Sequence, residues 1–440
     1  MVAAAAVLGA WAAVPAASAA PASVKSVSPV FAPSTLPATA GLPASMQHAL
    51  GSAAVHPAAA AASSFSFGSL LGVACKHPGD CLGVGEHETS TSTTATADLW
   101  AGSAWKATGL HLPGGATGGT LVDDSYSPGI LMAVGFYYKG SNSYPVDNLW
   151  TGNKWSEGPH QPAIPSGEKF AGLESVSCAS STFCIASGSY APARNTSDEV
   201  PLVELWNGSS WKQTPPPLPT STSFANLDAV SCLPNSASPT KSSCVVSGFY
   251  ATSTGLQAWA DSFDGEHWKN LKIPQPHGSS SNIWLDEVSD VSCSSLTSCA
   301  IVGIAAELNS KQTAIQTNSG FAETLANGTW TVATVRPSGK NSDLIGVDCL
   351  SSTFCMASGG IGAYNTAEGG EGDVALWNGS TWTTTAINPG TGMGSELTGI
   401  DCTSTTYCVA GGTRGGVNSQ SGQATSAFYN GTSWTQHAAP

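Results

Sequence analysis

The fold of this chain is constrained above all by a unit of roughly fifty to sixty residues that recurs seven times. The first block of the unit reads Leu-x-x-Val-Ser-Cys, five further residues, Cys and, four residues later, Gly. The second block reads Leu-Trp-Asn-Gly-x-x-Trp. Its final Trp recurs at intervals of 50, 56, 57, 62, 52 and 52 residues, as Trp105, Trp155, Trp211, Trp268, Trp330, Trp382 and Trp434. A period of this length marks a repeat fold rather than several unlike domains.

Six units carry a pair of Cys residues in the first block. The pairs are Cys75 and Cys81, Cys178 and Cys184, Cys232 and Cys244, Cys293 and Cys299, Cys349 and Cys355, and Cys402 and Cys408. Each pair flanks a turn between two expected strands, where facing Cα atoms lie about 4.5–5.5 Å apart, within reach of a disulfide. We therefore predict one disulfide inside each of these units. The spacing does not fit a zinc site, and we expect no metal and no cofactor.

The second unit lacks such a pair. When residues 120–135 are laid on the pattern, Ser125 and Leu131 occupy the two Cys positions and Gly135 occupies the glycine position. We expect this unit to fold like the others, without a disulfide.

Each unit predicts four short strands. Apolar and polar residues alternate along segments such as Leu173–Ser177 and Val203–Trp206. The Asn-Gly or Asp-Gly between the third and fourth strands, as at Asn207-Gly208, favours a type I′ hairpin turn with positive φ at two residues. The sequence predicts an all-β fold, a seven-bladed β-propeller of four-stranded antiparallel blades. A parallel β-helix would need much shorter coils. The propeller is expected over residues 63–440, with blades at about 63–113, 114–162, 163–219, 220–275, 276–337, 338–389 and 390–440.

The N-terminal residues indicate export. Residues 1–20 are predicted to be a signal peptide, and residues 21–62 a disordered linker rich in Ala, Pro and Ser. The apolar run ends in Ala17-Ser18-Ala19, a pattern that signal peptidase accepts, but no Lys or Arg precedes it. A start further upstream and a signal anchor are the alternatives. Twelve Cys residues, an even number, fit an oxidising compartment, so we expect a secreted, extracellular protein.

The charge balance excludes one class of partner. The chain has 15 basic and 29 acidic residues, a formal net charge of -14. Without a basic stripe to neutralise phosphates, it is not expected to bind nucleic acid. After signal cleavage no long apolar segment remains to hold it in a membrane, and we expect a monomer.

The units resemble the repeat of secreted actinobacterial β-propeller proteins, whose pattern is S-C-x-S-x-x-x-C-x-A-V-G followed by W-N-G-x-x-W. The resemblance covers residues 70–440, and it is carried well by Ser177–Ser180, Gly188, Trp206–Gly208 and Trp211. It implies export and a propeller, without an established activity. A more distant likeness relates the units to kelch-type propellers and to the Asp-box of sialidases, S-x-D-x-G-x-x-W. From that box Ser262–Trp268 departs by lacking the residue between Asp and Gly.

Most of the Trp residues have a structural explanation. Eleven of the fourteen lie in the repeated block, and we expect them to pack between adjacent blades. Trp259 and Trp284 lie outside the pattern and are therefore candidates for ligand binding.

Strand alternation places the predicted ligand site. The turns after the first and third strands lie on one face of a propeller, and the longer, more variable loops after the second and fourth strands lie on the other, here called the loop face. Variable loops on a rigid scaffold favour binding, so we predict a site on the loop face around the central channel. The candidates are Glu86, His87, Arg194, Glu199, Trp259, Trp284, Arg336, Glu371, Asp373 and Arg414.

The sequence leaves several functions open. No G-x-S-x-G, H-E-x-x-H or P-loop pattern occurs, and we assign no catalytic residue. The leading hypothesis is a non-catalytic propeller that binds an extracellular polysaccharide, cell wall or protein. The alternatives are a glycoside hydrolase or lyase using Glu86, Glu199 or Glu371, a sialidase-like enzyme using the three arginines, and a purely structural surface protein. Ca²⁺ binding at residues 368–373 is a weaker hypothesis, because the segment lacks the full EF-hand pattern.

Overall fold

The computed structural model describes most of the repeat region. The described residues are 66–152, 154–157, 161–192, 198–219, 222, 224–235, 242–252, 255–277, 284–308, 315–326, 328–335, 341–362, 370–391, 393–416 and 421–439. Within them the chain forms 28 strands and no helix. The predicted signal peptide and linker lie outside the described residues.

Every fourth strand occupies the same position in its blade. The first strands of the blades are β1 (Ser66–His77), β5 (Gly118–Ser127), β9 (Lys169–Ser180), β13 (Ala225–Leu233), β17 (Trp284–Ser295), β21 (Ser342–Ser351) and β25 (Met393–Ser404). The second strands are β2 (Asp80–Thr89), β6 (Ile130–Lys139), β10 (Phe183–Ala191), β14 (Ser243–Thr252), β18 (Ser298–Leu308), β22 (Phe354–Ile361) and β26 (Tyr407–Gly416). The third strands are β3 (Thr93–Trp100), β7 (Asn142–Trp150), β11 (Val200–Trp206), β15 (Gly255–Phe263), β19 (Ile315–Ala326), β23 (Glu371–Trp377) and β27 (Gly422–Tyr429). The fourth strands are β4 (Trp105–Ala107), β8 (Trp155–Glu157), β12 (Trp211–Gln213), β16 (Trp268–Leu271), β20 (Thr329–Val335), β24 (Trp382–Ile387) and β28 (Trp434–Ala438).

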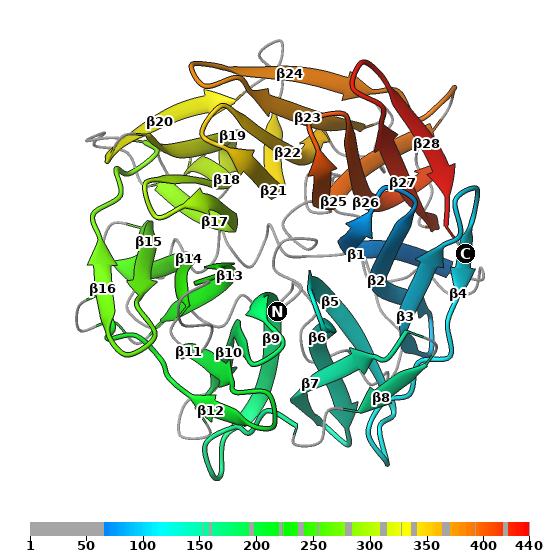
Figure 1. Cartoon of the computed structure of the whole chain (residues 1–440), viewed down its shortest axis with the longest axis vertical. Coiled ribbons are helices and arrows are strands. Elements are labelled where there is room, and N and C mark those ends of the chain that lie inside the picture. Colours follow the sequence, from blue (N-terminus) through cyan, green and yellow to red (C-terminus); the bar gives the residue numbers. More distant parts are fainter. Residues whose placement is uncertain are drawn as a thin grey trace, which may run out of the picture.

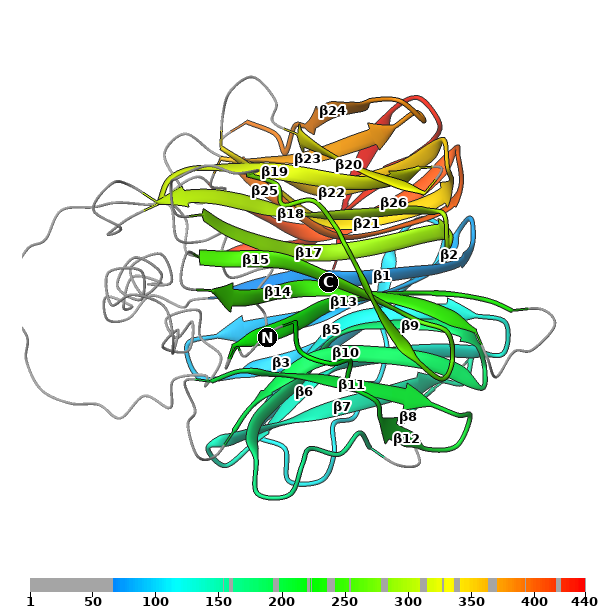
Figure 2. The ribbon, with the colours of Figure 1, turned by 90° about the vertical axis from the view of Figure 1, so that its left-hand side faces the viewer.

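Each consecutive group of four strands is one antiparallel blade, and the blades form a ring (Figure 1). The first strands line the centre of the ring and the fourth strands lie at its rim. Seen from the side, the ring of blades has the shape of a thick disc (Figure 2). The expected all-β propeller of four-stranded antiparallel blades is confirmed. We call the interface between two neighbouring blades a seam.

The ring closes without a shared blade, because every blade is built from four consecutive strands. Blade 1 and blade 7 meet through side chains and one parallel backbone contact between Phe67 and Gly422. The Trp105 indole N–H donates to Ser426 Oγ at 2.8 Å. These contacts replace the covalent continuity that a shared blade would provide.

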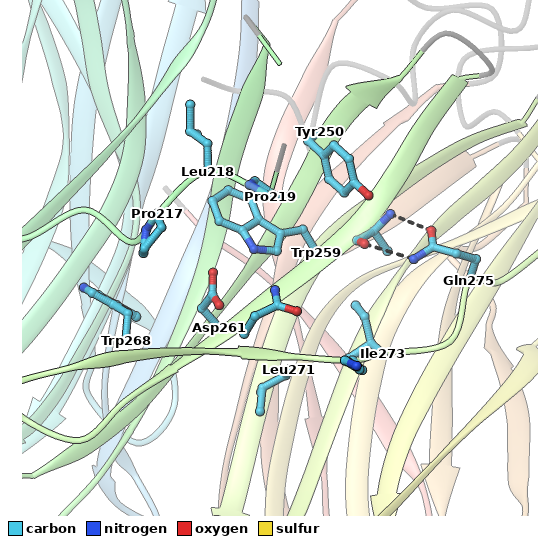
Figure 3. Close-up of a pocket in the computed structure, with 13 residues that line it drawn as sticks. Pro217, Leu218, Pro219, Tyr250, Trp259, Asp261, Trp268, Leu271, Ile273 and Gln275 are labelled. Carbon is cyan, nitrogen blue, oxygen red and sulfur yellow. Dashed lines mark hydrogen bonds between the residues drawn. The ribbon is translucent and has the colours of Figure 1, made fainter. Parts of the chain in front are cut away.

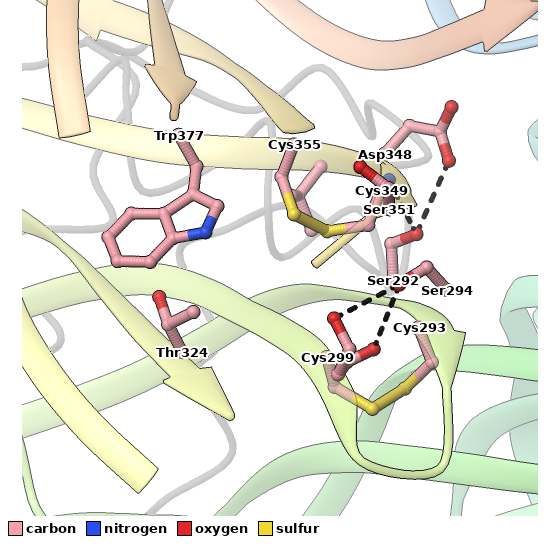
Figure 4. Close-up of a disulfide and its surroundings, with 12 residues drawn as sticks. Ser292, Cys293, Ser294, Cys299, Thr324, Asp348, Cys349, Ser351, Cys355 and Trp377 are labelled. Atoms are coloured by element: carbon pink, nitrogen blue, oxygen red, sulfur yellow. Dashed lines mark hydrogen bonds between the residues drawn. A yellow bond between two sulfur atoms is a disulfide. The ribbon is translucent and has the colours of Figure 1, made fainter. Parts of the chain in front are cut away.

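Side chains of the first strands join neighbouring blades around the channel. The residue before the first Cys of one blade accepts a hydrogen bond of 2.9–3.1 Å from the backbone N–H at the next blade's first Cys. Figure 4 shows one case, in which Cys349 N–H donates to Ser292 Oγ. The acceptors are Ser125, Ser177, Ser231, Ser292, Asp348 and Asp401. Seam 1–2 is the exception, because Ala74 stands at this position in blade 1.

All six predicted disulfides are present, and the described residues contain no free Cys. Each joins directly opposite residues of the first and second strands, with Cα atoms 3.9–4.0 Å apart. Five of them close a short turn, and these join Cys75 to Cys81, Cys178 to Cys184, Cys293 to Cys299, Cys349 to Cys355, and Cys402 to Cys408. The sixth, between Cys232 and Cys244, keeps the same geometry despite its longer turn. Local pairing within each unit is therefore confirmed.

The repeated glycine four residues after the second Cys is explained by a close backbone approach. A Cβ on Gly85 would stand 1.9 Å from the Ser69 carbonyl oxygen, and one on Gly248 would stand 2.0 Å from that of Asn226. Both contacts occur beside a register shift in the first strand, which pushes its carbonyl toward the second strand. No larger residue fits at this position.

The turn between the third and fourth strands differs from the prediction. In blade 3, Trp206 pairs with Trp211 across four residues, and Gly208 alone has a positive φ, of 94°. The side-chain Oδ1 of Asn207 accepts hydrogen bonds from the backbone N–H groups of Ser209 and Ser210. The type I′ assignment, with positive φ at two residues, is thus wrong. Asn is used here for its side-chain acceptor rather than for a left-handed backbone.

The alignment of the second unit is also corrected. Tyr126, not Ser125, lies opposite Leu131, and Ser125 accepts the hydrogen bond from Cys178 N–H that marks the position before the Cys. The turn in blade 2 is one residue shorter than in its neighbours, which displaced the prediction by one position. Gly135 does occupy the glycine position, opposite Leu121.

The repeated Trp residues pack in seams, as expected. The two Trp residues of a block face one another across their turn, with ring centroids 5.3 Å apart for Trp150 and Trp155. The final Trp then contacts the preceding blade: Trp155 N–H donates to Thr108 Oγ1 at 2.7 Å, and Trp268 N–H donates to the Thr214 carbonyl at 2.9 Å. These residues are accounted for by the scaffold.

Candidate functional site

The predicted loop-face residues lie on several blades, near three separate groups of acidic side chains. On blade 1, Thr120 Oγ1 donates to Glu86 Oε2 at 2.6 Å, while the neighbouring His87 is exposed and bonds with Ser66. Burial raises the pKa of Glu86, and the Thr120 hydrogen bond offsets part of the rise. Burial, with the charge of Glu86, raises the pKa of Glu88 to about 7.

A second group of acids consists of Glu199, Asp228 and Glu287, which belong to blades 3, 4 and 5. Glu199 is buried, and its Oε1 accepts a 2.6 Å hydrogen bond from Ser189 Oγ. Burial raises the pKa of Glu199 to about 7 and that of Glu287 to about 7. The pKa of Asp228 rises well above its usual value because of burial and the charges of Glu199 and Glu287. Burial is the largest cause of all three shifts.

A third set lies in blades 6 and 7. Asp373 is fully buried, and neither of its carboxylate oxygens has a hydrogen-bond partner. Burial, with the nearby Glu371, raises the pKa of Asp373 to about 7. Arg414 is half-buried on β26. Arg194 and Arg336 lie outside the described residues, so the three-arginine alternative stays a prediction, and Glu368 of the Ca²⁺ segment also lies outside them.

Two further acids, not among the site candidates, converge near the channel. Asp343 Oδ1 and Glu396 Oε1 each lie 3.4 Å from the point that a Cβ on Gly360 would occupy. Both side chains are almost completely buried, and Gly360 N–H donates to Asp343 at 2.6 Å. Burial raises both pKa values, that of Asp343 to about 8. Each acid directly precedes the repeated Leu of a first strand, and this shared position was the available signal.

Trp284, at the start of β17, belongs to a compact cluster in seam 4–5. The His277 ring lies parallel to its indole with centroids 5.6 Å apart, and His277 Nδ1 is hydrogen-bonded to the buried Asp286. Both carboxylate oxygens of the buried Glu323 lack a hydrogen-bond partner. Burial, with the charge of Asp286, raises the pKa of Glu323 to about 9. The cluster ties the segment that carries His277 to blade 5.

Trp259 is the predicted residue that lines a pocket. The pocket has a volume of ≈ 480 Å³ and lies in seam 3–4 (Figure 3). Its lining residues are Pro217, Leu218, Pro219, Tyr250, Ala258, Trp259, Asp261, Trp268, Asn270, Leu271, Lys272, Ile273 and Gln275. They come from the β12–β13 connection, from β14 to β16 and from the segment after β16. The pocket thus lies among the outer strands rather than at the channel mouth where the sequence placed a site.

The floor of this pocket is polar and unpaired. Trp259 and Asp261 are each 2% exposed, and neither the Trp259 indole N–H nor Asp261 Oδ2 has a hydrogen-bond partner. Burial raises the pKa of Asp261 to about 6, an effect partly offset by the nearby Trp259 and Asn270. Weak hydrogen bonding from the Trp259 indole and the Asn270 side chain causes this offset, but the contact between the indole N–H and Asp261 Oδ2 does not reach the geometry of a full hydrogen bond. One buried donor and one buried acceptor stand together at the base of the pocket (Figure 3).

The walls of the pocket are held in place by hydrogen bonds. Tyr250 OH donates to Gln257 at 2.8 Å. The Gln275 side chain pairs with both backbone groups of Ala258, accepting from its N–H at 3.0 Å and donating to its carbonyl at 3.1 Å. Gln275 thereby extends the sheet beyond the end of β16. Tyr250 and Gln275 carried no recognisable signal in the sequence.

Neither a metal site nor a membrane span is found in the described part of the chain. No group of three or more His, Cys, Asp or Glu side chains in it is arranged to hold a metal ion. It also contains no helix long and apolar enough to cross a membrane.

No protein-family model matches the chain, and no curated protein sequence matches it. Among solved structures it is similar to several propeller-type proteins. One is YCF48 from Cyanidioschyzon merolae, with 12% identity over 79% of this chain and 95% of the other and a TM-score of 0.43. Another is the Aleuria aurantia lectin in complex with α-methyl-L-fucoside, with 12% identity over 72% of this chain and 93% of the other and a TM-score of 0.44. A third is the α-L-arabinanase of Penicillium chrysogenum complexed with arabinobiose, with 10% identity over 84% of this chain and 99% of the other and a TM-score of 0.39. Similarities this distant carry no information about the ligand of this chain.

Proposed function

We propose that this protein is a secreted, non-catalytic propeller that binds an extracellular ligand in the seam 3–4 pocket. The proposal is carried by the pocket floor, where the Trp259 N–H and Asp261 Oδ2 are buried without partners. An unpaired buried polar group costs about 1–3 kcal/mol, and a ligand that pairs both groups recovers this free energy. Other buried polar groups of the described residues also lack partners, but this donor and acceptor line one pocket together, and that combination supports a binding site.

Extracellular location is supported by the disulfides. Six disulfides in one chain fit an oxidising compartment, because thiols are kept reduced in the cytosol. The ten loop-face candidates named from the sequence stay a prediction, of which Trp259 is the member that this proposal uses.

The test is a binding screen of the purified full chain against extracellular glycans and peptides, with Asp261→Asn as the diagnostic variant. Glu204→Gln is the matched control, because Glu204 is a buried acid at the same repeat position in blade 3. We expect Asp261→Asn to weaken binding about 10-fold or more and Glu204→Gln to leave it unchanged. Equal effects of the two variants would contradict the proposal.

A glycoside hydrolase is the second candidate, favoured by the convergence of Asp343 and Glu396. Paired carboxyls of unlike pKa about 5–10 Å apart are the arrangement that glycoside hydrolysis uses. Neither acid is among the residues that line the seam 3–4 pocket, which favours the binding function instead. Turnover of chromogenic glycosides that disappears in Asp343→Asn and Glu396→Gln would reverse this ranking.

A further inference from the structure

We infer that the ligand of the seam 3–4 pocket is a neutral saccharide, one sugar ring of which enters the pocket and pairs two neighbouring hydroxyl groups with Trp259 and Asp261. This inference rests on the proposed function and names the chemical class of the ligand.

The pocket floor requires a particular pairing from its ligand. The indole N–H of Trp259 only donates, and Asp261 Oδ2 accepts when the carboxylate is ionised. A ligand must therefore present an acceptor and a donor side by side on one edge. Every sugar hydroxyl is both donor and acceptor, so two adjacent hydroxyls meet this demand in any order. A trans peptide group does not, because its N–H and C=O point in opposite directions.

The wall of the pocket is partly apolar. The aromatic rings of Tyr250 and Trp268 and the side chains of Pro217 and Leu218 line the pocket, and Leu218 is 41% exposed. Sugar rings carry C–H groups beside their hydroxyls, so they bury apolar surface against aromatic faces while their hydroxyls stay paired. An apolar wall with a few convergent polar groups is the usual design of small-molecule sites.

Hydrogen bonds hold the walls of the pocket in place before a ligand enters. The Tyr250 hydroxyl is tied to Gln257, the Trp268 N–H to the Thr214 carbonyl, and Gln275 to the backbone of Ala258. A ligand that enters does not have to order these side chains, which reduces the entropic cost of binding. Weak, hydroxyl-rich ligands depend on such preorganised sites.

The volume limits the size of the bound portion. At ≈ 480 Å³ the pocket lies in the lower half of the range of small-molecule sites, about 300–1,000 Å³. It therefore takes the end of a glycan rather than the middle of a chain. Asn270 and Lys272 at the exposed rim supply further donors for a second sugar ring.

The experiment is saturation-transfer NMR on the full chain, with glucose, galactose, mannose, N-acetylglucosamine, cellobiose and lactose as probes. Ala-Pro-Ala and Gly-Tyr-Gly serve as peptide probes. We expect at least one sugar to receive saturation, with a dissociation constant raised about 10-fold by Asp261→Asn and about 5-fold by Trp259→Phe. Glu204→Gln should leave the constant unchanged. If either floor variant fails to fold, Asn270→Gln obstructs the pocket from its rim and should give the same loss.

The outcomes separate this inference from the proposed function. If a peptide binds, no sugar does, and Asp261→Asn weakens the peptide, the saccharide inference is overturned and the proposed function stands. If no probe binds, or if sugar binding is unchanged by Asp261→Asn, Trp259→Phe and Asn270→Gln, both are overturned.

Discussion

Seams 2–3 and 3–4 are built on the same repeat positions, yet one is bridged and the other holds a pocket. In seam 2–3, Gln213 of the fourth strand donates to the Ala163 carbonyl in the connection before blade 3, at 2.5 Å. The equivalent residue in seam 3–4 is Asn270, whose side chain is one methylene shorter and instead donates to Ala260 of its own blade at 3.4 Å. Pro219, which follows Trp211 by the same interval as Ala163 follows Trp155, then lines the pocket. We expect that this one methylene determines whether the fourth strand reaches the connection.

The third strands of these blades differ in the same direction. Opposite the repeated glycine, blade 3 has Leu202 and blade 4 has Trp259, and two residues later they have Glu204 and Asp261. The shorter acid and the amphipathic ring leave a polar floor under open space. A few substitutions at repeated positions thus accompany the change from a bridged seam to one that holds a pocket.

The largest effect on stability is expected from removing the disulfide that each of these two blades contains. Replacing both Cys of a disulfide by Ala should lower the free energy of unfolding by about 2.4 kcal/mol for Cys178–Cys184 and about 2.9 kcal/mol for Cys232–Cys244, because the second closes a longer loop. Urea unfolding of the two double variants measures the difference. A loss in blade 4 below half of that in blade 3 would mean that the pocket reflects a loosely anchored blade.

Asn270→Gln tests the role of the missing methylene directly. The longer side chain should reach the connection as Gln213 does, obstruct the pocket and weaken sugar binding about 10-fold, while stability is unchanged or slightly increased. Isothermal titration calorimetry and thermal unfolding provide the two readouts. Binding retained in a stable Asn270→Gln variant would break the comparison.

Gln213→Asn is the reciprocal change. It removes the hydrogen bond to Ala163 and should cost about 0.5–1.5 kcal/mol of stability, the usual net contribution of such a bond. Urea unfolding measures the loss. If Gln213→Asn and Asn270→Gln destabilise the protein equally, the two seams do not differ in the way described.

The smallest expected effect is a pH dependence shared by both seams. Burial raises the pKa of Glu204 to about 7 and that of Asp261 to about 6. The folded state then binds more protons than the unfolded state, so the stability due to these groups is fully present below about pH 4 and is lost as the pH rises through 6 to 7. Glu204→Gln and Asp261→Asn should therefore each be more favourable for stability at pH 8 than at pH 4. Urea unfolding at both pH values checks this, and a variant effect independent of pH would contradict it.

The sequence predicted what recurs and missed what differs by a single residue. Disulfides, strand order and the packing of the repeated Trp residues followed from seven copies of one pattern, because each copy supports the interpretation of the others. Ser125 was assigned the first Cys position, which Tyr126 occupies, because a turn shorter by one residue displaces the position before the turn when the unit is aligned on its glycine. The turn at Asn207-Gly208 was predicted to have positive φ at both residues, but only Gly208 has one. Asn-Gly occurs both in type I′ turns and in turns where the Asn side chain accepts hydrogen bonds, and the local sequence does not distinguish them.

The candidate site was harder to predict for a physical reason. Trp259 stood out because it lies outside the repeat, but its pocket depends on Asn270 failing to reach a connection in the preceding blade. Asp343 and Glu396 meet across a seam at positions separated by an entire unit. Such relations depend on how blades pack, which a linear pattern does not contain.

Ligand binding in the seam 3–4 pocket is tested most directly by ¹⁹F NMR of the full chain labelled with 5-fluorotryptophan. Resonances of Trp259, Trp211 and Trp284 are assigned with single Trp→Phe variants, and the sugar that receives the strongest saturation transfer is titrated. A pocket in seam 3–4 predicts a saturable shift of the Trp259 resonance, with Trp211 and Trp284 unmoved. A titration that shifts Trp284 and leaves Trp259 unchanged would contradict the account.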